Sequence, residues 1–472
     1  MREIITLSFG QIAGHINADY FNSQEHYFPL ASKSSSDPTV RFRRGVATDG
    51  RTETYNPRLL TWELKGGYGA FQAFNQFYTE GDKSQPKVWN EGEVKEIKEQ
   101  PVDKNEYQKS LDLGRENAAQ LSTDNTKRWT DYNRLLHHPK TRHQLDNWLF
   151  DPETAPQGIH RGGDQKWTGF DVGVNEWENV LNVDKEYLDS TLRSWVEECD
   201  SLGGLNVVVD DSAWAGVAAK ILANYRDDFD AKGTVVTWSV EAKPENKTRE
   251  TQKNAIQTTM ALSQVSSIYI PVSFHTKTPI DADFDPSSPW HQAALFGLSV
   301  YEPVQLLATQ RSGGLSLDAM AALLDTTGER NIVSEVGGSL TDADGDKSTV
   351  QYDSKLFQEL FLPSRIPPKT PHVFSDLSIA RLEDQDDDAN SYRLNQPMPA
   401  VSSQPGFTKQ YVSSKTRLAV TTKPRRTLLD MAKFVSVYER GDEREEMKQE
   451  LGDMASKYEH GWEEESDDDD DY

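Results

Sequence analysis

Apolar runs alternate with polar segments from the start of the chain, and their spacing predicts the first two elements. Ile4–Phe9 is rich in strand-forming residues and predicts a short buried strand. Gly10 and Gln11 interrupt this run, and apolar residues then recur at helical spacing up to Tyr20. A strand, a glycine turn and a helix N-terminus are the usual opening of an α/β domain. Such a turn is also where these folds bind phosphate, because free backbone N–H groups and the helix dipole point there.

Further strands and a helix follow along the chain. Leu59–Leu64 predicts a second strand, and Leu205–Val209 predicts one that is fully buried. A turn at Asp210–Gly216 leads into a helix at Val217–Tyr225, and Thr234–Val240 predicts the next strand. Because parallel neighbours need a crossover helix, this order predicts an α/β fold built on a doubly wound parallel sheet.

Three other stretches have weaker patterns. Residues 32–56 are polar and predict a long loop, in which Arg41–Arg44 is interpreted as a surface cluster. Trp129–Gly158 carries aromatic and leucine residues at roughly helical spacing and predicts a helical hairpin or an irregular insertion. Its histidines have no cysteine nearby and are interpreted as surface residues and not as metal ligands; they are His137, His138 and His143.

The C-terminal part predicts two consecutive helices, Arg426–Glu439 and Glu443–Trp462, each with an apolar face. The sequence then ends in the acidic run EEESDDDDDY. Like charges of this density favour a disordered, solvated tail.

Composition limits the functional classes. The net charge of −25 opposes direct binding of nucleic acid or an anionic membrane surface. No apolar run reaches the roughly 18 residues that a membrane-spanning helix needs. The single cysteine, Cys199, excludes an internal disulfide and is interpreted as a passive thiol. The first residues resemble neither a secretory signal nor a mitochondrial presequence.

The opening MREIITLSFGQIAGHIN resembles tubulin, whose chains begin MREIVHIQAGQCGNQIG, with matches at Met1–Ile4, Gly10, Gln11 and Ile16. The same opening, continued through Tyr20–Asn22, resembles the Misato family more closely. We expect the chain to belong to the fungal branch of that family. Misato proteins are tubulin-like proteins tied to the distribution and inheritance of mitochondria. The resemblance implies a tubulin-like α/β domain, an intermediate domain and C-terminal helices.

The segment Glu198–Phe229 also resembles tubulin, but the glycine loop GGGTGSG falls on DDSAWAG, residues 210–216. A phosphate loop needs glycines so that backbone N–H groups can approach the phosphate oxygens. The resemblance implies two acidic residues near a magnesium ion, at the positions of Glu63 and Lys65. Lys65 replaces one of them, and a lysine supplies no oxygen ligand for the ion. Ala321 stands where the resemblance implies a catalytic glutamate.

The sequence therefore predicts no catalytic residue and no metal site. The candidates that remain form a degenerate nucleotide loop and consist of Gly10, Gln11, Asp210, Asp211, Ser212 and Gly216. A metal that bridges Asp210 and Asp211 to a phosphate is the alternative reading of this loop.

The hypothesis that follows is a non-enzymatic tubulin-like protein without a resident cofactor. The resemblance implies a role in the partitioning of mitochondria and the inheritance of mitochondrial DNA, through contacts with other proteins. Two alternatives stay open: a GTP-binding, filament-forming GTPase, and a cytosolic cofactor of tubulin assembly.

The partners expected are other proteins, with tubulin and the cytosolic chaperonin as candidates, and the outer surface of mitochondria. We expect the protein on that surface and in the cytoplasm, without direct contact to nucleic acid. The expected segments are an N-terminal Misato/tubulin-like segment (1–118), the α/β core (119–310), an intermediate α/β domain (311–425), C-terminal helices (426–462) and the acidic tail (463–472).

Overall fold

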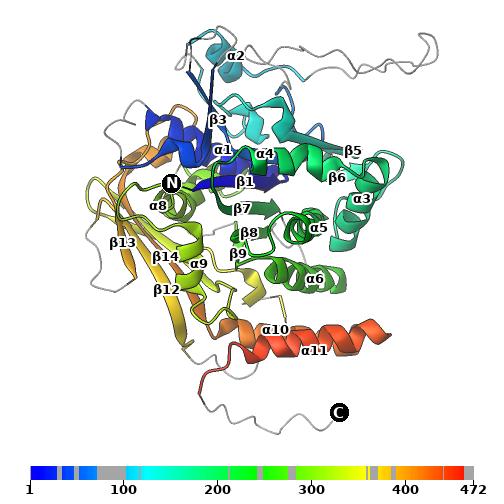
Figure 1. The fold of residues 1–472 in the computed structure, drawn as a ribbon. Coiled ribbons are helices and arrows are strands. Elements are labelled where there is room, and N and C mark those ends of the chain that lie inside the picture. Colours follow the sequence, from blue (N-terminus) through cyan, green and yellow to red (C-terminus); the bar gives the residue numbers. More distant parts are fainter. Residues whose placement is uncertain are drawn as a thin grey trace, which may run out of the picture.

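The computed structural model describes residues 2–28, 35–46, 51, 53–71, 102–115, 119–210, 213–241, 248–274, 283–357, 360–361, 370–383, 390–439 and 441–461. Two sheets with a buried helical segment between them organise this part of the chain (Figure 1).

The larger sheet has seven strands, and six adjacent strands run parallel, as the sequence predicts. Its order is β6-β5-β4-β1-β7-β8-β9, with only β6 antiparallel to its neighbour β5. The strands are β1 (Glu3–Phe9), β4 (Leu59–Lys65), β5 (Arg142–Asp151), β6 (Ala155–His160), β7 (Leu202–Asp210), β8 (Val235–Glu241) and β9 (Ile268–Ser273).

Helices cover both faces of this sheet. On one side α3 packs against α5, and α5 packs against α6, while α1 packs against α7. The bounds are α1 (Gln11–Glu25), α3 (Phe170–Val183), α4 (Ser194–Glu197), α5 (Ala213–Asp228) and α6 (Arg249–Val265); a π-helical segment, Asp189–Arg193, precedes α4.

A continuous buried helical segment separates the two sheets. It consists of α7 (Pro289–Phe296), a π-helical stretch (Gly297–Tyr301) and α8 (Glu302–Leu307), and every residue from Trp290 to Leu307 is buried. The segment contacts α1 on one side and strands of the second sheet on the other. Both of its sides face protein and not water, and the buried carboxylate that it carries, Glu302, forms an ion pair with the buried Arg381 at 3.4 Å.

The second sheet has five strands in the order β11-β10-β14-β12-β13 and is antiparallel apart from the β12–β13 pair. Its strands are β10 (Glu335–Asp342), β11 (Lys347–Gln351), β12 (Val373–Arg381), β13 (Ser391–Leu394) and β14 (Tyr411–Thr421). The shorter elements are β2 (Phe42–Val46), β3 (Glu53–Pro57), α2 (Glu106–Asp112) and α9 (Leu317–Leu324).

The two C-terminal helices are present, as predicted: α10 (Lys423–Tyr438) and α11 (Asp442–Ser456). They pack against each other along the lower edge of the molecule in Figure 1. The acidic tail lies outside the described residues. Among the residues that the structure does describe, none of the helices combines the length and the hydropathy needed to cross a bilayer.

Four expectations about local structure are wrong. The stretch expected as a long loop contains the β2–β3 hairpin. Arg41, expected at the surface, is buried, where its guanidinium donates to the Thr6 hydroxyl at 3.2 Å and to the side chain of Gln305. In the stretch expected as a helical hairpin or an irregular insertion, residues 142–160 form the antiparallel pair β5–β6. His137 and His143 are also buried and not at the surface.

Candidate functional site

The strand order places a topological switch point between β1 and β7. From β1 the chain continues to β4 on one side, whereas β7, β8 and β9 extend the sheet on the other side. In open α/β sheets, ligands bind in the crevice at the carboxyl ends of the two strands at such a point. Gly10 follows β1 here, and Asp210 is the last residue of β7. The structure therefore brings these two predicted site residues together.

The carboxylate of Asp210 caps helix α1. The backbone N–H of Ile12 donates to Oδ2 at 3.0 Å, and that of Ala13 donates to Oδ1 at 2.7 Å. Gly10, at the N-cap position, contributes no side-chain hydrogen bond. A helix N-terminus offers free N–H groups and a partial positive charge to an anion, and here a carboxylate of the same chain uses two of those groups.

Trp214 closes the approach to the Gly10 turn. Gly10 has φ +92°, and a Cβ built on it would lie 2.4 Å from Asp210 Oδ2 and 2.6 Å from Trp214 Cδ1. The Trp214 ring is buried in the first turn of α5 and meets Trp167 edge to face at 5.1 Å. Trp167 in turn meets Trp148 at 4.8 Å. A row of three indoles thus extends from the Gly10 turn, and its first member, Trp214, belongs to the segment on which the resemblance to tubulin places the glycine loop.

On the other side of the turn, the buried carboxyl group of Glu63 accepts hydrogen bonds from side chains of the same chain. The indole N–H of Trp129 donates to Glu63 Oε1 at 2.8 Å, and the Gln11 amide donates to the Gly67 carbonyl at 2.9 Å. Burial raises the pKa of the Glu63 carboxyl to about 8, and the Asp210 charge adds to the rise while hydrogen bonds from Gln11 and Trp129 oppose it. Glu63 is therefore mostly protonated at neutral pH.

Trp129 also packs directly on α1. A Cβ on Gly14 would lie 2.3 Å from Trp129 Cδ1, so the close fit of the indole on the helix depends on this glycine. Trp129 belongs to a small aromatic cluster over α1 with Tyr68, Tyr107 and Tyr132. Sequence reasoning missed this cluster. The signal available was the density of aromatic residues between β4 and β5.

Gly216 serves helix packing. A Cβ at this position would lie 2.2 Å from the Phe170 carbonyl oxygen and 2.9 Å from the Val174 nitrogen, both in α3. A Cβ built on Gly173 of α3 would likewise lie 1.7 Å from the backbone oxygen of Ala213 in α5. The two glycines allow α3 and α5 to cross closely. Gly216 lies inside α5, which begins at Ala213, and so the predicted turn is shorter than expected.

Two members of the predicted loop, Asp211 and Ser212, lie outside the described residues. Elsewhere in the described chain, no group of three or more His, Cys, Asp or Glu side chains is arranged to hold a metal ion. Burial raises the pKa of the half-buried Cys199 thiol to about 11, which makes the reactive thiolate scarce at neutral pH.

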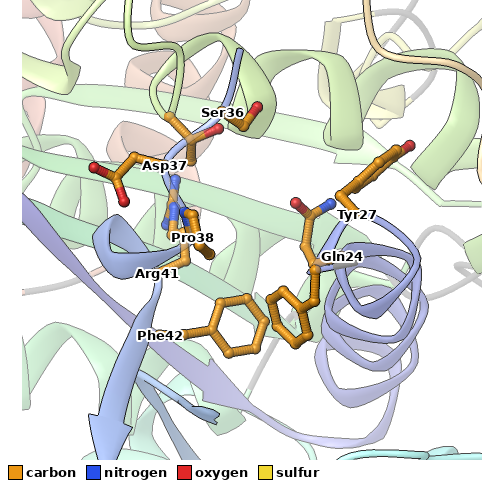
Figure 2. Close-up of a pocket in the computed structure, with 9 residues that line it drawn as sticks. Gln24, Tyr27, Ser36, Asp37, Pro38, Arg41 and Phe42 are labelled. Carbon is orange, nitrogen blue, oxygen red and sulfur yellow. The ribbon is translucent and has the colours of Figure 1, made fainter. Parts of the chain in front are cut away.

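A separate small cavity lies at the far end of α1, and its lining includes Gln24, Tyr27, Arg41 and Phe42 (Figure 2). Its volume is about 20 Å³, which suits a water molecule and excludes a nucleotide. The length of α1 separates this cavity from Gly10, so it adds no room to the crevice.

Comparison with known proteins gives matches to both halves of the α/β part. Residues 2–113 match the family described as Misato Segment II tubulin-like domain, and residues 118–309 match the family described as Tubulin domain. Over its full length the chain is similar to Protein DML1 of Yarrowia lipolytica, with 94% identity over 472 residues and complete coverage of both chains. It is also similar to the proteins of that name from Aspergillus niger (30% identity over 512 residues) and Gibberella zeae (28% over 518 residues), again with complete coverage of both.

Proposed function

Because the chain belongs to the Misato (DML1) family of tubulin-like proteins, we propose that it acts without enzymatic turnover, through contacts with other proteins, in the partitioning of mitochondria and the inheritance of mitochondrial DNA.

The observation that carries the non-enzymatic part is the bond between Asp210 and the N-terminus of α1. The N–H groups of Ile12 and Ala13, which an anion at this helix end would use, already have the Asp210 carboxylate as acceptor. The buried indole of Trp214 stands against Gly10 on the same side. A triphosphate placed here would have to displace a carboxylate and would meet its negative charge. These residues do not fit a nucleotide, and we propose no step through GTP or magnesium.

The mitochondrial part rests on the resemblance to Misato proteins. We propose that the protein works on the cytosolic face of the outer mitochondrial membrane and in the cytoplasm. Its partners would be proteins, and tubulin and the cytosolic chaperonin are the candidates. With a net charge of −25, direct binding to DNA is unfavourable, so an effect on mitochondrial DNA would be indirect.

A complementation experiment tests this proposal. Fungal cells depleted of their own family member would be supplied with this chain, and the mitochondrial distribution and mitochondrial DNA content per cell would be measured. Wild type and Gln11→Ala are both expected to restore normal values, because Gln11 contacts the Gly67 carbonyl and has no nucleotide to bind. A folded Gln11→Ala protein that fails to complement would point to nucleotide chemistry at the turn.

The same cells distinguish this proposal from the alternative of a cytosolic cofactor of tubulin assembly. Fractionation is expected to recover part of the protein with mitochondria. Co-purification with tubulin or chaperonin and no mitochondrial enrichment would contradict the proposal and favour a role in tubulin assembly.

A further inference from the structure

A groove lies where three helices that are distant in sequence approach one another. Its walls are the C-terminal end of α6, the outer side of α9 with the loop that follows, and one side of α11, all in the lower half of Figure 1. The volume of the groove is about 620 Å³, far larger than the water-sized cavity at α1. No step of the proposed function so far uses this surface.

The inside of the groove combines small and flexible apolar side chains. Ala321 and Ala322 of α9 leave space that larger residues would fill, and Met260 of α6 faces the groove from one wall. Met454 of α11 lines the opposite wall, and the buried Ile332 forms part of the floor. Methionine adapts its shape to different apolar partners, which suits a binding surface.

The rim of the groove is acidic. Asp325, Glu329, Glu450 and Asp453 line it, against a single cation, Lys457. Asp325 is engaged in its own loop, since its Oδ1 accepts the N–H groups of Glu329 and Arg330, both at 2.9 Å.

Three of these carboxylates have no cationic partner in an ion pair with any residue that the structure describes: Glu329, Glu450 and Asp453. Elsewhere on α11, by contrast, Glu445 pairs with Arg444 at 2.6 Å. Arg330, the cation adjacent in sequence, points its guanidinium at the Lys457 carbonyl and lies over the Phe374 ring at 4.2 Å.

The groove residues of α11 follow one helical face. Glu450, Asp453, Met454 and Lys457 stand at positions i, i+3, i+4 and i+7, a rise of about 10 Å. An occupant of matching length is two turns of a helix. It would place apolar side chains against the methionines and alanines, and lysine or arginine against the rim.

We propose that this groove binds a short, basic, amphipathic helical segment of a partner protein. The inference rests on the proposed function, since it gives the chemistry of one of the protein contacts. A second copy of this chain is a poorer occupant, because the net charge of −25 opposes its approach to an acidic rim.

A peptide titration tests the groove. The probe is a fluorescein-labelled helical peptide of about 18 residues with leucine and alanine on one face and lysine on the other. Its acidic counterpart, with glutamate in place of each lysine, is titrated in parallel. The full chain is expected to bind the basic peptide saturably and the acidic one not at all.

Two matched double variants separate the groove from general electrostatics. Glu450→Gln with Asp453→Asn removes two rim charges, whereas Asp146→Asn with Asp164→Asn removes two charges near the β5–β6 edge of the large sheet. The first is expected to weaken binding about tenfold, and the second less than about twofold. Equal binding by wild type and the rim variant, or equal losses in both variants, would overturn the proposal.

Ala322→Arg supplies an independent variant, because residue 322 is exposed and tolerates a larger side chain. The added arginine both fills the groove and repels the basic probe, so binding is expected to fall at least about tenfold. Sedimentation of the wild-type protein without peptide tests whether a second copy of the chain occupies the groove. Self-association that Ala322→Arg abolishes would assign the groove to a second copy and would overturn the proposal. Nucleotide titration of the same proteins is independent of these results, so failure of the groove and failure of the non-enzymatic function can be told apart.

Discussion

Asp210 Oδ1 lies 2.7 Å from the backbone nitrogen of Ala13, across 197 residues of sequence. The contact joins the carboxyl end of β7 to the first turn of α1 at the switch point of the sheet. It satisfies a helix N-terminus with a side chain of the protein, at the place where this type of fold offers the same N–H groups to a phosphate.

Replacement of Asp210 tests this cap. Asp210→Ala leaves the N–H groups of Ile12 and Ala13 without their acceptor, so the free energy of unfolding is expected to fall by about 2 kcal/mol. Chemical denaturation measures the change. Asp164→Ala, at an exposed position, serves as the control and is expected to change stability by less than about 0.5 kcal/mol. An Asp210→Ala protein as stable as wild type would show that the cap contributes nothing.

The same variant should gain an anion site. With the carboxylate gone, sulfate can bind the freed N–H groups, and a ligand that binds only the folded state raises the denaturation midpoint. Added sulfate is therefore expected to stabilise Asp210→Ala more than wild type. The control is chloride at equal ionic strength, and an equal response of both proteins to sulfate would contradict the idea.

Gly10 is expected to be intolerant of any side chain. In Gly10→Ala the methyl group would meet both Asp210 and Trp214, at a backbone φ of +92° that alanine rarely adopts. We expect a loss of about 3 kcal/mol in the free energy of unfolding. Gly452→Ala is the matched control, because this glycine lies inside α11 with open space around it and should gain about 0.5–1 kcal/mol. Similar effects of both substitutions would show that the turn is not tightly packed.

The buried Glu63 predicts a loss of stability toward alkaline pH. Burial raises its pKa from 4.5 to about 8, so between these values the folded chain holds a proton that the unfolded chain has lost. The contribution of this group to the free energy of unfolding is therefore fully present below pH 4.5 and is lost as the pH rises through 8. Between pH 5.5 and 8 the contribution is expected to fall by about 3 kcal/mol. Glu63→Gln has no proton to lose and is expected to lack this part of the pH dependence. Parallel stability curves for both proteins would exclude a raised pKa at Glu63.

His143 predicts the opposite trend at acid pH. Burial lowers its pKa from 6.5 to about 3, so between these values the unfolded chain gains a proton that the folded chain excludes. The free energy of unfolding falls with falling pH, by about 2 kcal/mol from pH 7.5 to 5. His143→Phe keeps the ring stacked on Trp62 and removes the titration. The difference in stability between the variant and wild type should grow toward pH 5, and a constant difference would contradict the prediction.

Local pattern was sufficient to predict the centre of the fold. The strands β1, β4, β7 and β8 and the helices α1, α10 and α11 carry unbroken apolar periodicity, and each is present near its expected position. In β5 the periodicity is broken. Leu64 pairs with Leu145 and the next residue, Lys65, pairs with Leu149, so the strand contains an irregularity between two buried stretches. Apolar residues at 145, 148 and 149 then imitate helical spacing, which is why a helical hairpin was predicted there.

The site depended on contacts that no local pattern contains. The resemblance to tubulin placed aspartates where a glycine loop is expected. It did not indicate that Asp210 reaches α1, because that contact follows from the order of strands in the sheet. Arg41 is a similar case: its partner Gln305 lies 264 residues away, and without it the arginine looks like a surface residue. The burial of Trp214 against Gly10 and of Trp129 against Gly14 was likewise decided by tertiary packing.

The most direct measurement is a titration of the purified full-length chain with GTP in the presence of Mg²⁺, by calorimetry and by the fluorescence of its tryptophans, which include Trp214 beside the turn. Self-capping of α1 by Asp210 predicts no saturable binding up to about 1 mM GTP, and no release of phosphate. Saturable binding at micromolar GTP, with a change in the environment of Trp214 that Trp214→Phe abolishes, would contradict it.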